Sequence, residues 1–199
     1  MDASYLQQLA QVFEGTMSND TTIRQQAEQF LKTNQKTAGF GVALLEISGN
    51  KDLNPNVSLG AAVQLSNLVE YHWKFADATH AQKIAGEGFD YTILSEEDKN
   101  NVRTQLVAKM YECEDQKIIK QYSRCIITIA RLDYPTKWPT LLSQDITNAL
   151  NSQNEKGILT GLIALFGLVK KYEYEMEEDR EPLYAILQSV FATLGNLIN

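Results

Sequence analysis

The stretch DYPTKWPTLL (residues 133–142) places two prolines and a tryptophan between two apolar segments that both have helical periodicity. Pro135 disfavours the helical conformation for Tyr134, so we expect the preceding helix to end at about Asp133. The second proline can occupy the first turn of the next helix, where its missing N–H costs no hydrogen bond. Trp138 lies between the prolines, and we expect this large apolar ring, like that of Trp73 one helix pair earlier, to be buried between successive helix pairs. The stretch therefore predicts a sharp corner between two packed helices.

Outside this corner, apolar residues recur at spacings of three and four along most of the chain, and strand-like alternation is rare. This spacing is typical of amphipathic helices. Two segments, CIITIARL and GLIALFGLV, are apolar on more than one face, which predicts burial from more than one side. The expected helices lie at about residues 5–15, 23–31, 42–47, 55–73, 102–110, 118–133, 141–150, 157–172 and 182–194.

Several boundaries between these helices carry recognisable signals. Asn54 followed by Pro55 combines a side-chain cap with a proline in the first helical turn. The sequence SEED (residues 95–98) resembles a capping box in which aspartate replaces the usual glutamate. Residues 74–94 break the periodicity, and the acidic run Glu173–Glu181 precedes the last helix, so we expect both segments to be loops.

The helices fall into pairs, and the pairs repeat. The second helix of each pair is expected to end near Lys32, Trp73, Leu132 and Lys171, at intervals of 41, 59 and 39 residues. The long middle interval contains the inserted loop, and a period of about 40 residues is typical of HEAT-type solenoids. The fold class that we predict is all-α, a right-handed α-α superhelix of HEAT-type antiparallel helix pairs. The alternative is a single up-and-down bundle, which a series of nine helices fits less well.

Composition narrows the function classes. The 199 residues carry a formal net charge of -7, which argues against direct nucleic-acid binding and favours basic protein partners. No stretch approaches the roughly 18 apolar residues of a membrane helix, so we expect no membrane partner. The first residues lack the pattern of a signal peptide. Cys113 and Cys125 form neither a zinc pattern nor a disulfide framework, which favours a reducing compartment.

The sequence offers no catalytic constellation. His72 and His80 flank no nucleophile, and we find no phosphate loop, metal cluster or serine-centred elbow. Cys125 lies among isoleucines and is expected to pack in the core as a small apolar residue. His72 is expected at a helix end. We therefore expect no enzyme activity, no cofactor and no metal.

Three groups of residues resemble motifs of the importin-β superfamily of nuclear transport receptors. The family's entry motif matches Arg24, Ala27, Glu28 and Leu31. Its next signature, small residues followed by leucine, lysine and asparagine and then a distal tryptophan, resembles AAVQLSNLVEYHW, which includes Leu65 and ends at Trp73. Its third repeat commonly ends in an acidic residue, an aromatic residue and proline before a tryptophan, which matches Asp133, Tyr134, Pro135 and Trp138.

Within the superfamily, the resemblance is greatest to the importin-seven and importin-eight branch. YTILSEEDKNNVR, CIITIARLDYPTKW and LVKKYEYEMEEDREPL resemble segments of that branch in the same order. The resemblance implies that residues 1–199 are the N-terminal HEAT-repeat arm of a much longer solenoid, with the importin-β N-terminal region at about residues 24–104. Leu194 and Leu197 are then expected to be core residues in the first helix of a fifth helix pair.

The resemblance also implies a function. Family members carry protein cargo through nuclear pores, move between cytoplasm and nucleus, and release import cargo when Ran-GTP binds to the second helices of the N-terminal repeats. We therefore expect Ran-GTP to contact exposed polar residues on those helices. The alternative is that each of these residues only faces solvent, as most exposed polar side chains do. The expected contacts are Gln29, Asn67, Glu70, Lys120, Gln121 and Lys170. Ser66 replaces the family's usual lysine before the signature asparagine, which places one contact in doubt.

Further partners follow from the same resemblance. The acidic run Glu173–Glu181, which follows Lys170 and Lys171, is either a solvated loop or an electrostatic attractor of basic protein cargo. The family binds nucleoporin phenylalanine-glycine repeats, mainly through regions beyond these residues. The alternative function is a HEAT-repeat protein–protein scaffold without a Ran switch.

Overall fold

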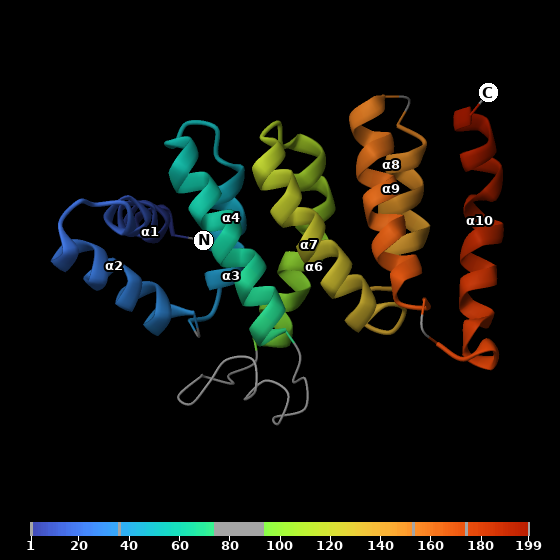
Figure 1. The fold of residues 1–199 in the computed structure, drawn as a ribbon, viewed down its shortest axis with the longest axis horizontal. Coiled ribbons are helices and arrows are strands. Elements are labelled where there is room, and N and C mark those ends of the chain that lie inside the picture. Colours follow the sequence, from blue (N-terminus) through green and yellow to red (C-terminus); the bar gives the residue numbers. More distant parts are fainter. Residues whose placement is uncertain (1, 36, 74–93, 153, 174, 199) are drawn as a thin grey trace. The chain divides into compact units, whose positions relative to one another are not determined.

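A computed structural model describes residues 2–35, 37–73, 94–152, 154–173 and 175–198, and within these residues the structure is helical and has no strand (Figure 1). The predicted loop at 74–94 lies outside the described residues except for Leu94. The elements are α1 (Ala3–Thr16), α2 (Thr21–Asn34), α3 (Phe40–Gly49), α4 (Pro55–His72), α6 (Glu96–Glu112), α7 (Gln116–Asp133), the π-helix η1 (Leu141–Ile146), α8 (Thr147–Leu150), α9 (Glu155–Lys170), the 3-10 helix η2 (Glu177–Arg180) and α10 (Glu181–Ile198).

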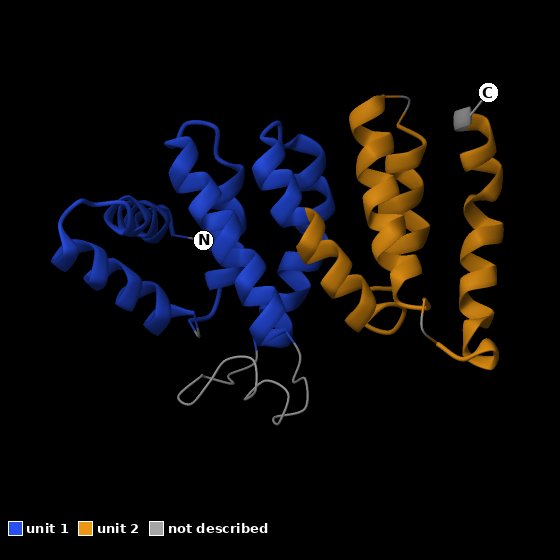
Figure 2. Cartoon of the chain, viewed as in Figure 1, with its two compact units in different colours: residues 1–122 blue, residues 123–199 orange. Residues whose placement is uncertain are grey.

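The chain divides into two compact units, residues 1–122 and 123–199 (Figure 2). In the first unit α1 packs on α2 and α3 packs on α4, and each pair is joined by a short turn, as in an antiparallel hairpin. The first helices also pack on one another, because α3 contacts both α1 and α6. In the second unit α9 packs on η1 and α8, and α10 contacts α8. First helices thus lie against first helices in both units.

Side-chain caps fix several helix starts. The Asn54 carboxamide accepts a hydrogen bond from the Asn56 N–H at 2.9 Å, and Pro55 occupies the first turn, as predicted. Asp20 begins α2 in the same way, since its carboxylate accepts from the Thr22 N–H at 2.7 Å. Each bond satisfies one of the N–H groups that a helix start leaves without an intrahelical partner.

The start of α6 differs from the predicted capping box. The Ser95 hydroxyl caps the helix by accepting from the Asp98 N–H at 3.1 Å. The Asp98 carboxylate is one methylene shorter than the usual glutamate, and it accepts instead from the Gly39 N–H at 2.6 Å. Gly39 has a φ of 82°, a conformation that favours glycine, and it directly precedes α3. One aspartate therefore ties the start of α6 to the start of α3.

The core of the first unit is largely apolar and includes a buried hydrogen bond between two hydroxyls. Phe40, Leu44 and Leu65 have no exposed surface, and Trp73 is 1% exposed, which confirms its predicted burial. The hydroxyls of Ser48 on α3 and Tyr122 on α7 lie 2.7 Å apart in this core. The bond satisfies two polar groups that would otherwise be costly to bury.

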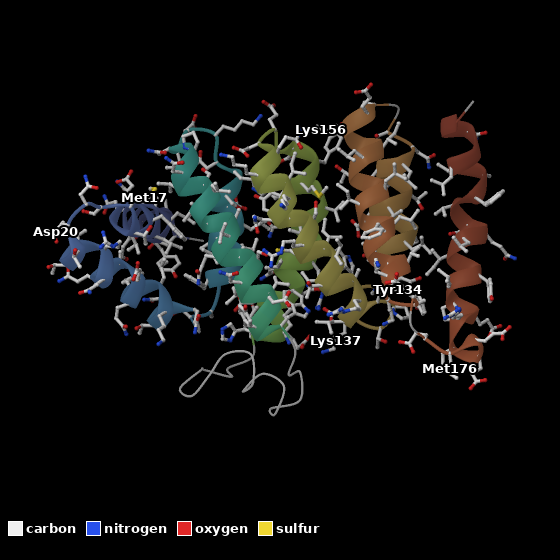
Figure 3. All side chains as sticks on the ribbon, viewed as in Figure 1. Met17, Asp20, Tyr134, Lys137, Lys156 and Met176 are labelled. Carbon is white, nitrogen blue, oxygen red and sulfur yellow. The ribbon has the colours of Figure 1, made fainter. Side chains whose placement is uncertain are left out.

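The corner that follows α7 lies in the second unit. The helix ends at Asp133, as Pro135 predicts, and the peptide bond between Tyr134 and Pro135 is cis. The Asp133 carbonyl accepts from the N–H groups of Lys137 and Trp138 at 2.7 and 3.2 Å, which closes the turn. Figure 3 shows Tyr134 and Lys137 at this corner.

Trp138 is 2% exposed, so its predicted burial is also confirmed. Its indole N–H donates to the Asp145 carboxylate at 3.1 Å, and burial raises the pKa of that carboxyl while this bond lowers it. The Lys171 ammonium group donates to the carbonyls of Arg131 and Tyr134 at the end of α7. The residues after the corner begin as a π-helix (Leu141–Ile146), which the sequence pattern did not indicate.

The second unit exposes more apolar surface than we expected. A Cβ on Gly167 would lie 2.9 Å from the Ile127 Cα, so α9 approaches the backbone of α7 closely on one side. The other side of α9 exposes Leu159, Leu162 and Phe166, contrary to the predicted burial from more than one side. The predicted acidic loop at 173–181 is partly wrong as well, because η2 is helical. Tyr174 lies outside the described residues.

Candidate functional site

The described residues contain no group of three or more histidine, cysteine, aspartate or glutamate side chains that could hold a metal ion. In the same part of the chain, none of the helices has both the length and the apolar character needed to cross a membrane. Cys125 is 1% exposed and His72 is the buried last residue of α4, so both predictions of a structural position are confirmed. The remaining candidate site is the surface of the second helices.

The predicted contact residues in the first unit all lie on second helices. Gln29 is exposed on α2, and Asn67 and Glu70 are exposed on α4. Lys120 is exposed and Gln121 is half-buried on α7. These positions are accessible to a protein partner.

Lys170 belongs to the second unit and is half-buried at the end of α9. Its ammonium nitrogen lies 2.6 Å from a carboxylate oxygen of Glu173 and 5.5 Å from the centre of the Phe166 ring. The Lys170 ammonium group would have to exchange the Glu173 carboxylate for a group of the partner. Exposed ion pairs of this kind contribute little to stability.

The exposed face of α4 is the best-defined part of this surface. Positions 56, 60, 63, 67 and 70 follow one another at three- and four-residue steps, so they line one face of the helix. This face changes character along its length, since Gly60 and Val63 precede Asn67 and Glu70. The α4 face therefore offers apolar contacts in its first half and polar contacts in its second.

Ser66 does not lie on that face. It is 3% exposed, so the position at which the family usually has a lysine points into the first unit in this chain. Because Ser66 is buried, this side chain is not part of the exposed face of α4. A small hydroxyl fits the buried position, whereas a lysine there would have to extend its ammonium group to the surface.

Most of the family-motif residues lie in the core or at turns of the fold. The Arg24 guanidinium donates to the Ser18 carbonyl at 2.9 Å and to the Thr21 hydroxyl at 3.4 Å, which holds the turn between α1 and α2. Leu65 is fully buried, whereas Glu28 is exposed. The corner motif at 133–138 closes the turn after α7, as described above.

Sequence reasoning missed a buried charged group beside Trp73. The Arg103 guanidinium lies 5.8 Å from the centre of the Trp73 ring, and both side chains are buried. The Glu96 carboxylate lies 3.0 Å from the Lys99 ammonium group and 3.9 Å from Arg103. The spacing of Glu96 and Lys99 on one helix is the only signal that would have indicated this group from the sequence.

Comparison with known proteins agrees with this geometry. Residues 27–112 match the family model of the importin-beta N-terminal domain. Importin-8 of Danio rerio is 30% identical over 190 residues, which cover 96% of this chain and 18% of the relative. Exportin-2 of Drosophila melanogaster is 24% identical over 196 residues, which cover 97% of this chain and 19% of that protein. The chain thus spans about a fifth of the length of these relatives.

Solved structures share the fold. The exportin Cse1 in its cargo-free, cytoplasmic state matches with a TM-score of 0.78 over 97% of this chain and 19% of that chain, at 20% identity. The Kap95:Nup1 complex gives 0.67 over 92% of this chain and 21% of that chain, at 22% identity. Kap95p with RanGDP, whose switch loops adopt the GTP-bound conformation, gives 0.54 over 94% and 26%, at 20% identity.

These likenesses confirm the predicted fold class, so the chain is an all-α protein of HEAT-type antiparallel helix pairs. Within that class, residues 27–112 match the importin-beta N-terminal domain, and the chain is similar to importin-8 over nearly its whole length. The resemblance that the sequence motifs indicated is therefore confirmed.

Proposed function

We propose that this chain is the N-terminal arm of a nuclear transport receptor and that it binds Ran-GTP on its second helices. The match to the importin-beta N-terminal domain at residues 27–112 is the observation that carries the proposal. The structural neighbour Kap95p with RanGDP gives further support, because its fold matches 94% of this chain. Ran-GTP binding to such an arm releases import cargo, so the arm couples transport to the nucleotide state of the GTPase.

The polar residues of the first unit supply the proposed contacts. Gln29, Asn67, Glu70, Lys120 and Gln121 come from three second helices and include both charge signs. Lys170 is a sixth contact, contributed by α9 of the second unit. Exposed polar pairs are individually weak, so affinity on such a surface depends on several of them acting together.

The cargo that we propose is basic protein. The net charge of -7 and the exposed carboxylates of Glu175, Glu177, Glu178 and Asp179 favour a positively charged partner. The proposed nucleoporin partner is supported by the Kap95:Nup1 neighbour. Similarity to importin-8 supports import, and similarity to exportin-2 makes export the competing direction. A receptor of either kind moves between cytoplasm and nucleus.

We also propose that residues 1–199 form part of a longer solenoid. The exposed apolar side chains on α9 are joined by Tyr184, Leu187 and Phe191 on α10, at the spacing of a helix face. Exposed apolar faces of this kind normally lie against another element of the protein or a partner. A following helix pair would cover them in the way that α6 covers α3.

The test is binding of the purified chain to Ran in its GTP and GDP states, measured by titration calorimetry. We expect selective binding of the GTP state, which the double variant Asn67→Ala/Glu70→Ala weakens. The matched control is Asn100→Ala/Glu112→Ala, which changes two exposed residues of the same types on the first helix α6 and leaves affinity unchanged. Equal binding of both states, or none, by the folded full-length receptor supports the scaffold without a Ran switch.

A further inference from the structure

The hairpin formed by α1 and α2 packs closely within itself. A Cβ on Gly15 of α1 would lie 3.1 Å from the Ala27 Cβ on α2, so the two helices are in tight contact. The Arg24 guanidinium donates to the Ser18 carbonyl at 2.9 Å, which holds the turn between them. The α1–α2 hairpin is therefore expected to move as one body.

The joint between this hairpin and the α3–α4 hairpin is apolar. α1 contacts both α3 and α4, and the Phe13 side chain on α1 is 3% exposed. A Cβ on Gly60 of α4 would lie 3.2 Å from the Phe13 ring, so the two helices approach closely at this point. In residues 2–35 and 37–73, the side-chain hydrogen bonds of α1 and α2 stay within residues 2–34 or reach Thr37 in the connection to α3. Apolar contact is non-directional, so it does not fix the angle of the joint.

Polar side chains hold the next joint, at which α3 packs against α6 and the first residues of α7. Hydrogen bonds depend on direction as well as distance, so they resist a change of angle. The three ties are the Asp98–Gly39 and Ser48–Tyr122 hydrogen bonds and the Lys109–Glu46 ion pair, at 2.6, 2.7 and 2.8 Å. This joint is therefore stiffer than the one before it.

Two hollows lie beside the untied joint. The first, of about 590 Å³, separates α1 from the end of α3 and is lined in part by Leu6, Ala10 and Ile47. The second, of about 390 Å³, lies between the end of α1, α2 and α4, and its wall includes Met17 and Val63. Side chains that border a hollow lack packing partners on that side, so they resist displacement less than side chains in a filled interface. The α1–α2 hairpin thus has room to tilt toward α3 or toward α4.

We propose that the α1–α2 hairpin pivots on the contact of Phe13 with Gly60, while α3, α4 and α6 stay together as one body. Tilting in one direction narrows the hollow beside α3, and tilting in the other narrows the hollow beside α4. Motions in which packed helices hinge or slide past one another take place in microseconds to milliseconds. The pivot changes the angle between α2 and α4, so the exposed faces of these helices are not held in one fixed arrangement.

Residual dipolar couplings of the backbone N–H bonds test the pivot in the wild-type chain, because they report the orientation and order of each helix in a weakly aligning medium. The couplings of α1 and α2 form one group, and those of α3, α4 and α6 form the other. We expect each group to fit a single alignment tensor. The tensor of the first group is expected to be smaller in magnitude, because tilting averages its couplings. Equal magnitudes for the two groups, or separate tensors for α1 and α2, would overturn the pivot.

Filling one hollow tests where the room for the motion lies. Val63→Trp adds a ring to the wall of the hollow beside α4, and tryptophan and valine have similar helix propensities. The matched control is Thr104→Trp, which replaces an exposed β-branched residue of α6 that lines neither hollow. Met17→Trp fills the same hollow if Val63→Trp does not fold.

We expect the filling variant to bring the tensor magnitude of the α1–α2 hairpin closer to that of the second group, and the control to leave it as in the wild type. A folded filling variant that leaves the order of the hairpin unchanged shows that the hollow does not limit the tilt, which contradicts the proposal. The measurement contains no Ran, so its outcome is independent of the proposed function.

Discussion

Replacement of Trp138 tests the corner from which the fold was inferred. The ring is 2% exposed, and a tryptophan of this kind buries roughly 200 Å². At about 25 cal/mol per Å² this burial corresponds to about 5 kcal/mol, which is an upper value because the unfolded chain already buries part of its surface. We expect Trp138→Ala to lower the free energy of unfolding by about 3–5 kcal/mol.

The variant Trp138→Phe separates the ring from its hydrogen bond. Most of the apolar contact remains, but the Asp145 carboxylate loses the indole donor that lies 3.1 Å away. A buried group that loses its partner costs about 1–3 kcal/mol. Because burial raises the pKa of Asp145 and this bond lowers it, the variant raises that pKa further.

The pH dependence then has a defined sign. Asp145 has a raised pKa in the folded state, so the folded chain holds more protons than the unfolded chain between pH 3.8 and that raised value. Stability therefore falls as pH rises through this window, and the cost is fully present at neutral pH. Trp138→Phe is expected to destabilise the chain more at pH 7 than near pH 3, where the carboxyl is protonated in both states.

Urea denaturation followed by far-ultraviolet circular dichroism measures these differences. The control is Asp145→Asn, which removes the titrating group and should make the effect of Trp138→Phe independent of pH. A loss of less than about 1 kcal/mol for Trp138→Ala would refute the packing argument, since surface substitutions fall in that range. An effect of Trp138→Phe that does not change with pH in the wild-type background would refute the role of the carboxylate.

Three further substitutions test contacts elsewhere. Gly167→Ala should lower the melting temperature, because the added Cβ would lie 2.9 Å from backbone of α7, and an unchanged value would contradict that close approach. Tyr122→Phe should cost about 1–2 kcal/mol in urea denaturation by removing the bond to Ser48, and a stabilised variant would argue against it. Asp98→Ala should cost about 1–2 kcal/mol and increase amide exchange at Gly39, and exchange that stays slow would show that the carboxylate is dispensable.

Local signals in the sequence were sufficient to predict several helix boundaries and the burial of the two tryptophans. Asn54, Pro55 and Pro135 act on the backbone of their immediate neighbours, so their effects can be read without knowing the fold. The burial of Trp73 and Trp138 follows from the large apolar area of the rings. The repeat of about 40 residues and the family motifs together predicted the pairing of helices into HEAT-type repeats.

Features that depend on distant residues were not predictable. Asp98 bonds to Gly39, which lies 59 residues earlier, and the π-helix after the corner carries no known local signal. Lys171 holds the end of α7 from 40 residues away. The burial of Ser66 depends on how α4 lies against its neighbours. Sequence reasoning placed the proposed polar contacts on second helices, and the contacts themselves stay a prediction.

Hydrogen exchange of the chain with and without Ran-GTP tests the central claim most directly, because it reports which helices the GTPase covers. The account predicts slower exchange along α2, along α4 near Asn67 and Glu70, and along α7 near Lys120 and Gln121, with no change along α3 and α6. Protection confined to the first helices, or an unchanged profile at saturating Ran-GTP, would contradict it.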